Sequence, residues 1–127
     1  MNALLLDDEQ PVLESLAGKL GLFCPEVTVV AQCNTVDEAL TVLAHESIDI
    51  LFLDVNLNGE SGFDLIEKWS GDELPSLIFT TAFDEFAVKA IKHAALDYLL
   101  KPIDAEDLVK AVRKAGQKVS RDLQDVV

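Results

Sequence analysis

The feature that most constrains the fold is an alternation of five short apolar runs with segments of helical periodicity. The runs are Ala3–Leu6, Val27–Ala31, Ile48–Leu53, Leu77–Phe79 and Tyr98–Leu100. The first, third and fourth runs are apolar at successive positions, which is typical of parallel strands that helices cover on both faces. A chain of 127 residues has room for one domain of this kind.

The intervening segments predict five helices. Pro11 suits the first turn of the first helix, where its missing N–H is not needed. Thr35 to Glu38 is a capping box that starts the second, with Thr35 as the N-cap. The third helix is expected after Gly62, and the last begins near Asp104. The fourth is expected to carry Phe86, Ala87, Ala90 and Ile91.

Five β–α repeats predict a flavodoxin-like, doubly wound (βα)5 three-layer sandwich. Right-handed crossovers with helices on both faces favour a parallel sheet of strand order 2-1-3-4-5. Ligands of such sheets bind beyond the carboxyl ends of the strands, beside the switch point between strands 1 and 3. The functional residues are therefore sought where the five apolar runs end.

The charge balance narrows the range of partners. Ten Lys and Arg residues against 23 Asp and Glu residues give a formal net charge of −13. Such a chain is expected to bind neither nucleic acid nor an anionic membrane by itself, and to attract cations and basic surfaces.

No apolar run reaches the length of a membrane span, and no signal peptide precedes the first run, which predicts a soluble, cytoplasmic protein. Cys24 and Cys33 are expected to be reduced packing residues.

Polar residues follow four of the runs. Asp7 and Asp8 follow the first, Asp54 the third, Thr81 the fourth and Lys101 the fifth. Three carboxylates at close quarters need compensating charge, which a divalent cation and the lysine ammonium together supply. Oxygen ligands without a nearby His or Cys select Mg²⁺, with Mn²⁺ as a substitute.

This group of residues is typical of phosphoryl transfer. Asp54 is the candidate nucleophile, because a carboxylate can form an acyl phosphate. Lys101 and the metal would neutralise the phosphoryl oxygens, and Thr81 could donate a hydrogen bond to one of them. His45 and His93 fall in helical segments, so we expect neither to bind metal or relay phosphate.

The strand-end residues, together with Tyr98-x-x-Lys101-Pro102, resemble the receiver domain of two-component response regulators. The resemblance implies that Asp54 accepts a phosphoryl group from a sensor histidine kinase. It also implies that Asp8, Asp54 and the backbone carbonyl of Asn56 bind Mg²⁺, that Asp7 acts through a coordinated water, and that Lys101-Pro102 is a cis peptide. Such a domain is a switch rather than an enzyme, promoting only its own phosphorylation and slow dephosphorylation.

The segments 79–87 and 97–103 are more specific and resemble the LytR/AlgR-type transcription regulators. The resemblance implies that Tyr98 turns inward when Thr81 moves toward the phosphate, reshaping the face of helix 4, strand 5 and helix 5 for homodimerisation. Phe83 would then shield the acyl phosphate. The contact residues expected on the reshaped face are Phe86, Lys89, Lys92, His93, Asp97 and Lys110.

Regulators of that type continue into a DNA-binding effector domain, which this sequence lacks. We therefore expect residues 1–119 to be the receiver, and 120–127, where the helical pattern weakens, to be a fraying tail or the start of a linker. A stand-alone receiver acting through protein contacts is the alternative. A haloacid dehalogenase-like phosphatase is disfavoured, because Asn56 stands where that class needs a second Asp. A module with a degenerate site is disfavoured because every charged group is present, and nucleotide-binding motifs are absent.

Overall fold

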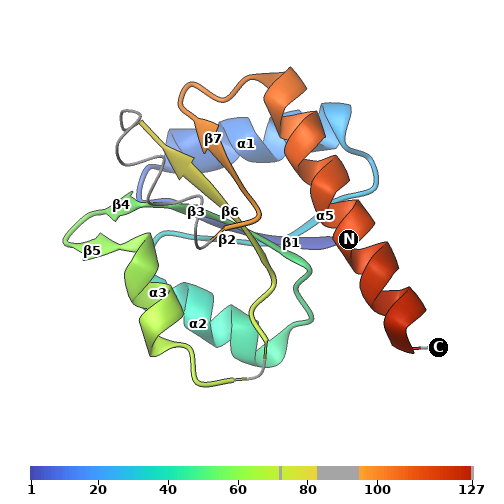
Figure 1. The fold of residues 1–127 in the computed structure, drawn as a ribbon. Helices are drawn as coiled ribbons and strands as arrows, with labels where there is room; N and C mark the ends of the chain where they lie inside the picture. Colours follow the sequence, from blue (N-terminus) through green and yellow to red (C-terminus); the bar gives the residue numbers. More distant parts are fainter. Residues whose placement is uncertain (72, 83–94, 127) are drawn as a thin grey trace.

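The computed structural model describes residues 1–71, 73–82 and 95–126, with side chains up to Arg121, and has helices on both faces of a parallel sheet (Figure 1). The elements are β1 (Asn2–Leu6), α1 (Gln10–Phe23), β2 (Thr28–Cys33), α2 (Val36–His45), β3 (Ile50–Asp54), β4 (Asn56–Leu57), β5 (Glu60–Ser61), α3 (Gly62–Lys68), β6 (Ser76–Thr81), β7 (Asp97–Leu100) and α5 (Ala105–Val126). The sheet order β2-β1-β3-β6-β7 confirms the predicted 2-1-3-4-5 arrangement, because β4 and β5 form a separate antiparallel pair.

Two apolar clusters hold the three layers together. Side chains alternate along each strand, so neighbouring residues of β1 enter different clusters. Leu5 packs on the face that α1 and α5 cover, whereas Leu4 and Leu6 pack on the face of α2 and α3 (Figure 1). Cys24 and Cys33 are free and buried, one in each cluster, as expected of packing residues.

The burial of the strands follows their place in the sheet. The central strands β3 and β6 are buried at every position, and β1 is buried at all but its first residue. The edge strands β2 and β7 are only partly buried. This difference confirms the sequence interpretation that the first, third and fourth runs are covered on both faces.

The helix starts agree with the sequence signals in part. Pro11 lies in the first turn of α1, as predicted. Thr35 accepts a hydrogen bond from the Glu38 N–H at 3.2 Å, but the Glu38 carboxylate accepts from the Asn34 N–H at 3.3 Å instead of returning to Thr35. The predicted capping box of α2 is therefore only half formed. A complete capping box that the sequence analysis missed starts α3, between Ser61 and Asp64.

The end of the chain also differs from expectation. The helix α5 continues through Val126, although its sequence pattern weakens from Ser120. The predicted fourth helix, with Phe86, Lys89, Lys92 and His93, lies outside the described residues, as does Phe83. In the described ranges, no helix combines the length and apolarity that a bilayer crossing requires.

Replacing Thr35 by Ala removes the side-chain cap of α2, and we expect the free energy of unfolding to fall by about 1 kcal/mol. Urea denaturation measures the loss. The matched control is Thr41→Ala in the same helix, because the Thr41 hydroxyl donates only to the Asp37 carbonyl one turn earlier. Equal losses in the two variants would contradict a specific capping role.

Candidate functional site

Three carboxylates meet at the carboxyl edge of the sheet. Asp7 and Asp8 follow β1 directly, and Asp54 is the last residue of β3. The strands are neighbours, with Leu6 in register with Leu53, so the aspartates that follow leave the sheet side by side. One carboxylate oxygen from each of the three lies within 4.8 Å of the other two. Asp7 and Asp54 are buried, being 3% and 6% exposed, whereas Asp8 is partly exposed.

The cation that enters this cluster comes from the end of β7. The Lys101 ammonium lies 2.8 Å from Asp7 Oδ2 and 3.0 Å from Asp54 Oδ2, so it bridges the two buried acids. The Lys101 backbone is fixed by its N–H, which donates to the Thr81 carbonyl at 2.8 Å. The Lys101-Pro102 peptide is cis, as the resemblance implied.

Backbone N–H groups orient the carboxylates. Asp7 Oδ1 accepts from the Glu9 N–H at 2.9 Å, and Asp54 Oδ1 accepts from the Asn56 N–H at 3.2 Å. Asp8 Oδ2 accepts from the Asn58 N–H at 3.1 Å. The two buried acids thus each present one oxygen to the backbone and the other to Lys101, while Asp8 is tied to the β4–β5 turn.

The electrostatics of Asp54 are a balance of opposed effects. Burial raises the pKa of its carboxyl above the ordinary value of 3.8, and Asp7 adds to the rise. The hydrogen bond and charge of Lys101 act in the other direction, but the pKa of Asp54 remains raised overall. For Lys101, burial lowers the pKa and the bonds to Asp7 and Asp54 raise it, leaving the pKa above 10.5. The Lys101 ammonium therefore stays charged at neutral pH. The Asp54 carboxyl beside it loses its proton less readily than an exposed aspartate does.

Two features of the site were missed by the sequence analysis. The first is the β4–β5 turn, which supplies the Asn58 N–H to Asp8 and has φ 80° at Gly59. The Asn58-Gly59 pair is a common hairpin signal that could have identified it. The second is Gly62, where an added Cβ would overlap the Asp54 carbonyl oxygen, while the Gly62 N–H donates to the Val55 carbonyl at 2.9 Å. No short sequence pattern predicts that the start of α3 lies this close to the end of β3.

The other residues that the sequence analysis named have less defined positions relative to the acid cluster. Thr81 is fully buried at the end of β6, beside Asp54 through the pairing of Asp54 with Thr80. Tyr98 is half-buried in β7, in register with Phe79 and packed on the α2–α3 face. The Asn56 side chain is exposed.

Two residues expected on the contact face are also described. Asp97 forms a 3.2 Å ion pair with Lys114, and Lys110 is exposed on α5. His45, at the end of α2, is exposed and has its Nδ1 2.8 Å from the Thr41 carbonyl.

The cluster fits a hard divalent cation. All three side chains offer oxygen, their ligand atoms are close enough to share one ion, and a single lysine leaves two negative charges uncompensated, which a divalent cation balances. Among the described residues, no other group of three His, Cys, Asp or Glu side chains meets the same criterion.

Replacing Gly62 by Ala should force α3 away from β3, because the new Cβ has no room beside the Asp54 carbonyl. We expect a loss of about 1–3 kcal/mol in the free energy of unfolding, measured in urea. Gly18→Ala is the control, since nothing lies within 4 Å of its Cβ position in α1 and alanine favours the helix by up to about 1 kcal/mol. A tolerated Gly62→Ala substitution would disprove the steric constraint.

The raised pKa of Asp54 predicts a pH-dependent stability. Because the folded pKa exceeds that of the unfolded chain, the folded state loses stability as the pH rises through the folded pKa. Asp54→Asn should therefore raise the melting temperature at pH 7 in EDTA, and this gain should shrink as the pH falls below that folded pKa. The control Asp37→Asn, in the exposed first turn of α2, should give no gain. A lower melting temperature for Asp54→Asn at pH 7 would show that the ion pair outweighs the cost of burial.

Comparison with known proteins agrees with this geometry. Residues 3–113 match the family model of the response regulator receiver domain. A response regulatory protein of Shewanella oneidensis is 41% identical over 120 residues, which cover 94% of this chain and 50% of that protein. The sensory transduction protein LytT of Enterococcus faecalis is 38% identical over 122 residues, covering 95% of this chain and 50% of LytT. The chain thus spans about half the length of these curated relatives.

Solved structures give the same result. The receiver domain of AraT, a response regulator from Geobacillus stearothermophilus, has a TM-score of 0.79 at 30% identity, with 96% of this chain and 97% of that one covered. The response regulatory domain of mrkE from Klebsiella pneumoniae has a TM-score of 0.80 at 25% identity, covering 95% and 99%. These matches are to receiver domains and not to the phosphatase class that the sequence left open. The chain belongs to the response regulator receiver domain family, and its curated relatives include the LytT and LytR sensory transduction proteins.

Proposed function

We propose that this receiver domain is a phosphorylation switch in which Asp54 accepts a phosphoryl group from a sensor histidine kinase. The observation that supports this most directly is the Lys101 ammonium, which lies 2.8 Å from Asp7 and 3.0 Å from Asp54. A buried carboxylate beside a fixed cation and two further acids is suited to accept a phosphoryl group, whose added negative charge needs compensation.

The transfer uses one carboxylate oxygen of Asp54. That oxygen forms a bond to phosphorus, the P–N bond to the donor histidine breaks, and the imidazole retains its electron pair. Lys101, which Asp7 holds in place, can follow the charge onto the phosphoryl oxygens, and Thr81 can donate a hydrogen bond to one of them. The Asn56 N–H fixes the other Asp54 oxygen throughout.

The acid cluster of Asp7, Asp8 and Asp54 fits Mg²⁺, with Mn²⁺ as a substitute. Asp8, Asp54 and the backbone carbonyl of Asn56 would hold the ion, and Asp7 would act through a water. When bound, the ion supplies the positive charge that offsets the phosphoryl oxygens. The hydrogen bond from the Asn58 N–H leaves the second Asp8 oxygen available for it.

The output follows from Thr81 and Tyr98. We infer that phosphorylation draws Thr81 toward Asp54 and that Tyr98 turns inward, changing the face of α5 and β7 on which two phosphorylated copies associate. The relatives include the sensory transduction proteins LytT and LytR. The resemblance of segments 79–87 and 97–103 to LytR/AlgR-type regulators supports a role in a regulator with a DNA-binding effector domain. Residues 1–119 would be the receiver, and 120–127 would begin the connection to that domain. A stand-alone cytoplasmic receiver that acts through protein contacts is the second form of this proposal.

Asp54→Asn should abolish covalent labelling by acetyl phosphate, since the amide has no nucleophilic carboxylate oxygen. Intact mass spectrometry measures the phosphoryl adduct, with and without Mg²⁺, and the wild type should be labelled only when Mg²⁺ is present. The control Asp37→Asn removes an exposed acid from α2 and should label like the wild type. Stoichiometric labelling of Asp54→Asn would refute the assignment.

Mg²⁺ should raise the melting temperature of the wild-type domain, because it binds the folded acid cluster and not the unfolded chain. Asp8→Ala should remove most of this gain, while Asp37→Ala should retain it. Thermal unfolding in Mg²⁺ and in EDTA gives the difference for each variant. A full Mg²⁺ response in Asp8→Ala would exclude Asp8 as a ligand.

A further inference from the structure

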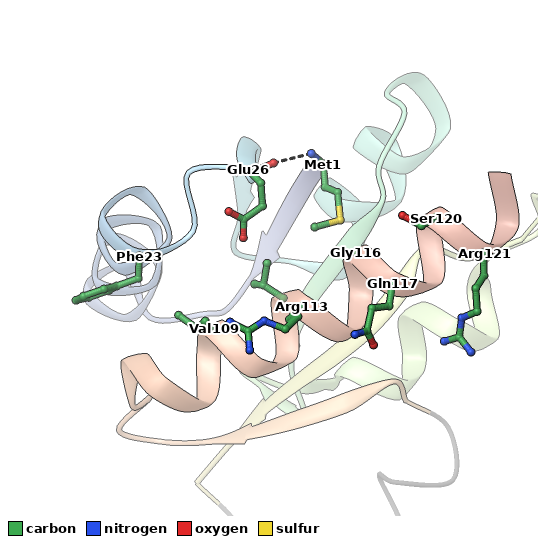
Figure 2. A pocket seen from close by; sticks show the side chains of 10 residues that line it. Met1, Phe23, Glu26, Val109, Arg113, Gly116, Gln117, Ser120 and Arg121 are labelled. Atoms are coloured by element: carbon green, nitrogen blue, oxygen red, sulfur yellow. Dashed lines mark hydrogen bonds between the residues drawn. The ribbon is translucent and has the colours of Figure 1, made fainter. Parts of the chain in front are cut away.

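A second surface lies at the opposite edge of the sheet. The C-terminal end of α1, the residue Met1 before β1 and one side of α5 enclose an open groove of about 810 Å³ (Figure 2). The Met1 amino group donates to the Glu26 carbonyl at 2.7 Å, which closes one side of it (Figure 2). The acid cluster lies at the other end of β1, about 17 Å away along five strand residues.

The charge in this groove is unlike that of the rest of the chain. Arg113 and Arg121 are the only two arginines in a chain with a net charge of −13, and both line the groove. They point from α5 along the same side as Gln117 (Figure 2). Within the described part of the chain, neither guanidinium forms an ion pair, and Glu26 is the only acidic side chain in the lining.

The floor and wall of the groove are apolar. Val109 and the buried Val112 contribute from α5, and the Phe23 side chain, 50% exposed, stands at the end of α1. Leu22, next to Phe23, is 79% exposed. Gly116 leaves the middle of the groove open, because the nearest atom to its Cβ position is the Met1 Cε at 3.6 Å. Exposed apolar groups rimmed by cations are typical of an interaction surface.

We propose that this groove docks an acidic amphipathic helix of a partner protein. Arg113 and Arg121 are eight residues apart on α5, which places them about 12 Å apart along its axis. A docked helix would pair a carboxylate with each guanidinium at positions about two turns apart, and would insert an apolar side chain over Gly116 toward Val112 and Phe23. Arginine favours this use, because its planar fork binds carboxylates in a bidentate manner.

The shape argues for a helix rather than a small anion. The lining of α5 runs from Val109 to Arg121, about 18 Å or just over three turns, and is open to solvent along this length. A free phosphate or carboxylate would contact a guanidinium but leave the exposed parts of Phe23 and Val109 uncovered, whereas a helix with one apolar stripe covers them.

The test selects helices directly against the wild-type domain. The probe is a library in which one face of a preformed helical bundle is randomised and displayed, so that no helix must fold on binding. We expect the selected faces to carry acids about two turns apart with a large apolar residue between them. Selection that yields no binders, or binders without the acidic pair, overturns the proposal.

Variants of the domain then locate the binding site. Arg113→Gln and Arg121→Gln should each weaken the selected binder by at least about tenfold, whereas Lys118→Gln, the same charge change elsewhere on α5, should alter the affinity by less than about twofold. Gly116→Leu should block the groove, while Gly18→Leu, on the open surface of α1, should not. Circular dichroism confirms that each variant is folded.

The result of this binding test does not depend on whether Asp54 accepts a phosphoryl group. Asp54→Asn should bind the selected helix with wild-type affinity, because the groove and the acid cluster lie at opposite ends of β1. Equal binding by wild type, Arg113→Gln and Arg121→Gln would place the binder elsewhere and overturn the proposal, whatever the fate of Asp54.

Discussion

The site depends on one ammonium group placed between two buried carboxylates. Asp7 and Asp54 are less than a tenth exposed, and two such groups would repel each other and resist ionisation without a cation. The Lys101 ammonium is hydrogen-bonded to both, which lowers the cost of ionising Asp54, the proposed phosphoryl acceptor. Its partial compensation leaves a negative charge in the cluster that a divalent ion can neutralise. The proposed reactivity and the proposed metal affinity would thus have the same physical origin, an acid cluster with too little positive charge.

The sheet makes this arrangement possible at low entropic cost. Asp7, Asp54 and Lys101 are far apart in the sequence, but each lies at the carboxyl end of a strand of the same parallel sheet. Because the strands run in one direction and their register is fixed by buried alternating side chains, their carboxyl ends meet at one edge. The apolar residues of β1, β3 and β6 therefore determine where the charged residues lie. A register slip of one residue would turn both the core and the acid cluster to the wrong side.

The parts that could be predicted from the sequence are those with a local signature. The apolar runs such as Ile48–Leu53 identify the strands, their order follows from handedness, and the acids and Lys101 follow from the strand ends. The features that could not be predicted depend on backbone groups meeting in space. The Asn58 N–H on Asp8 and the approach of Gly62 to the Asp54 carbonyl are of this kind. The Glu38 carboxylate accepts from the Asn34 N–H and not from the Thr35 N–H, and the sequence pattern of a capping box does not distinguish these two partners.

The groove beside α5 and the acid cluster share β1, which bears on whether they can influence each other. The residues from Ala3 to Leu6 are at most 1% exposed and are paired on both sides, with β2 and β3. A strand held in this way is rigid, so a partner helix docked against Met1 has no flexible element through which to displace Asp7.

Coupling would need a partner helix that binds the phosphorylated and unphosphorylated states with different affinities, and α5 is the element that could provide this difference. One side of α5 lines the groove and another carries Lys114, which pairs with Asp97 beside Tyr98. Any communication between partner binding and phosphorylation is therefore expected through movement of α5 and not through the sheet.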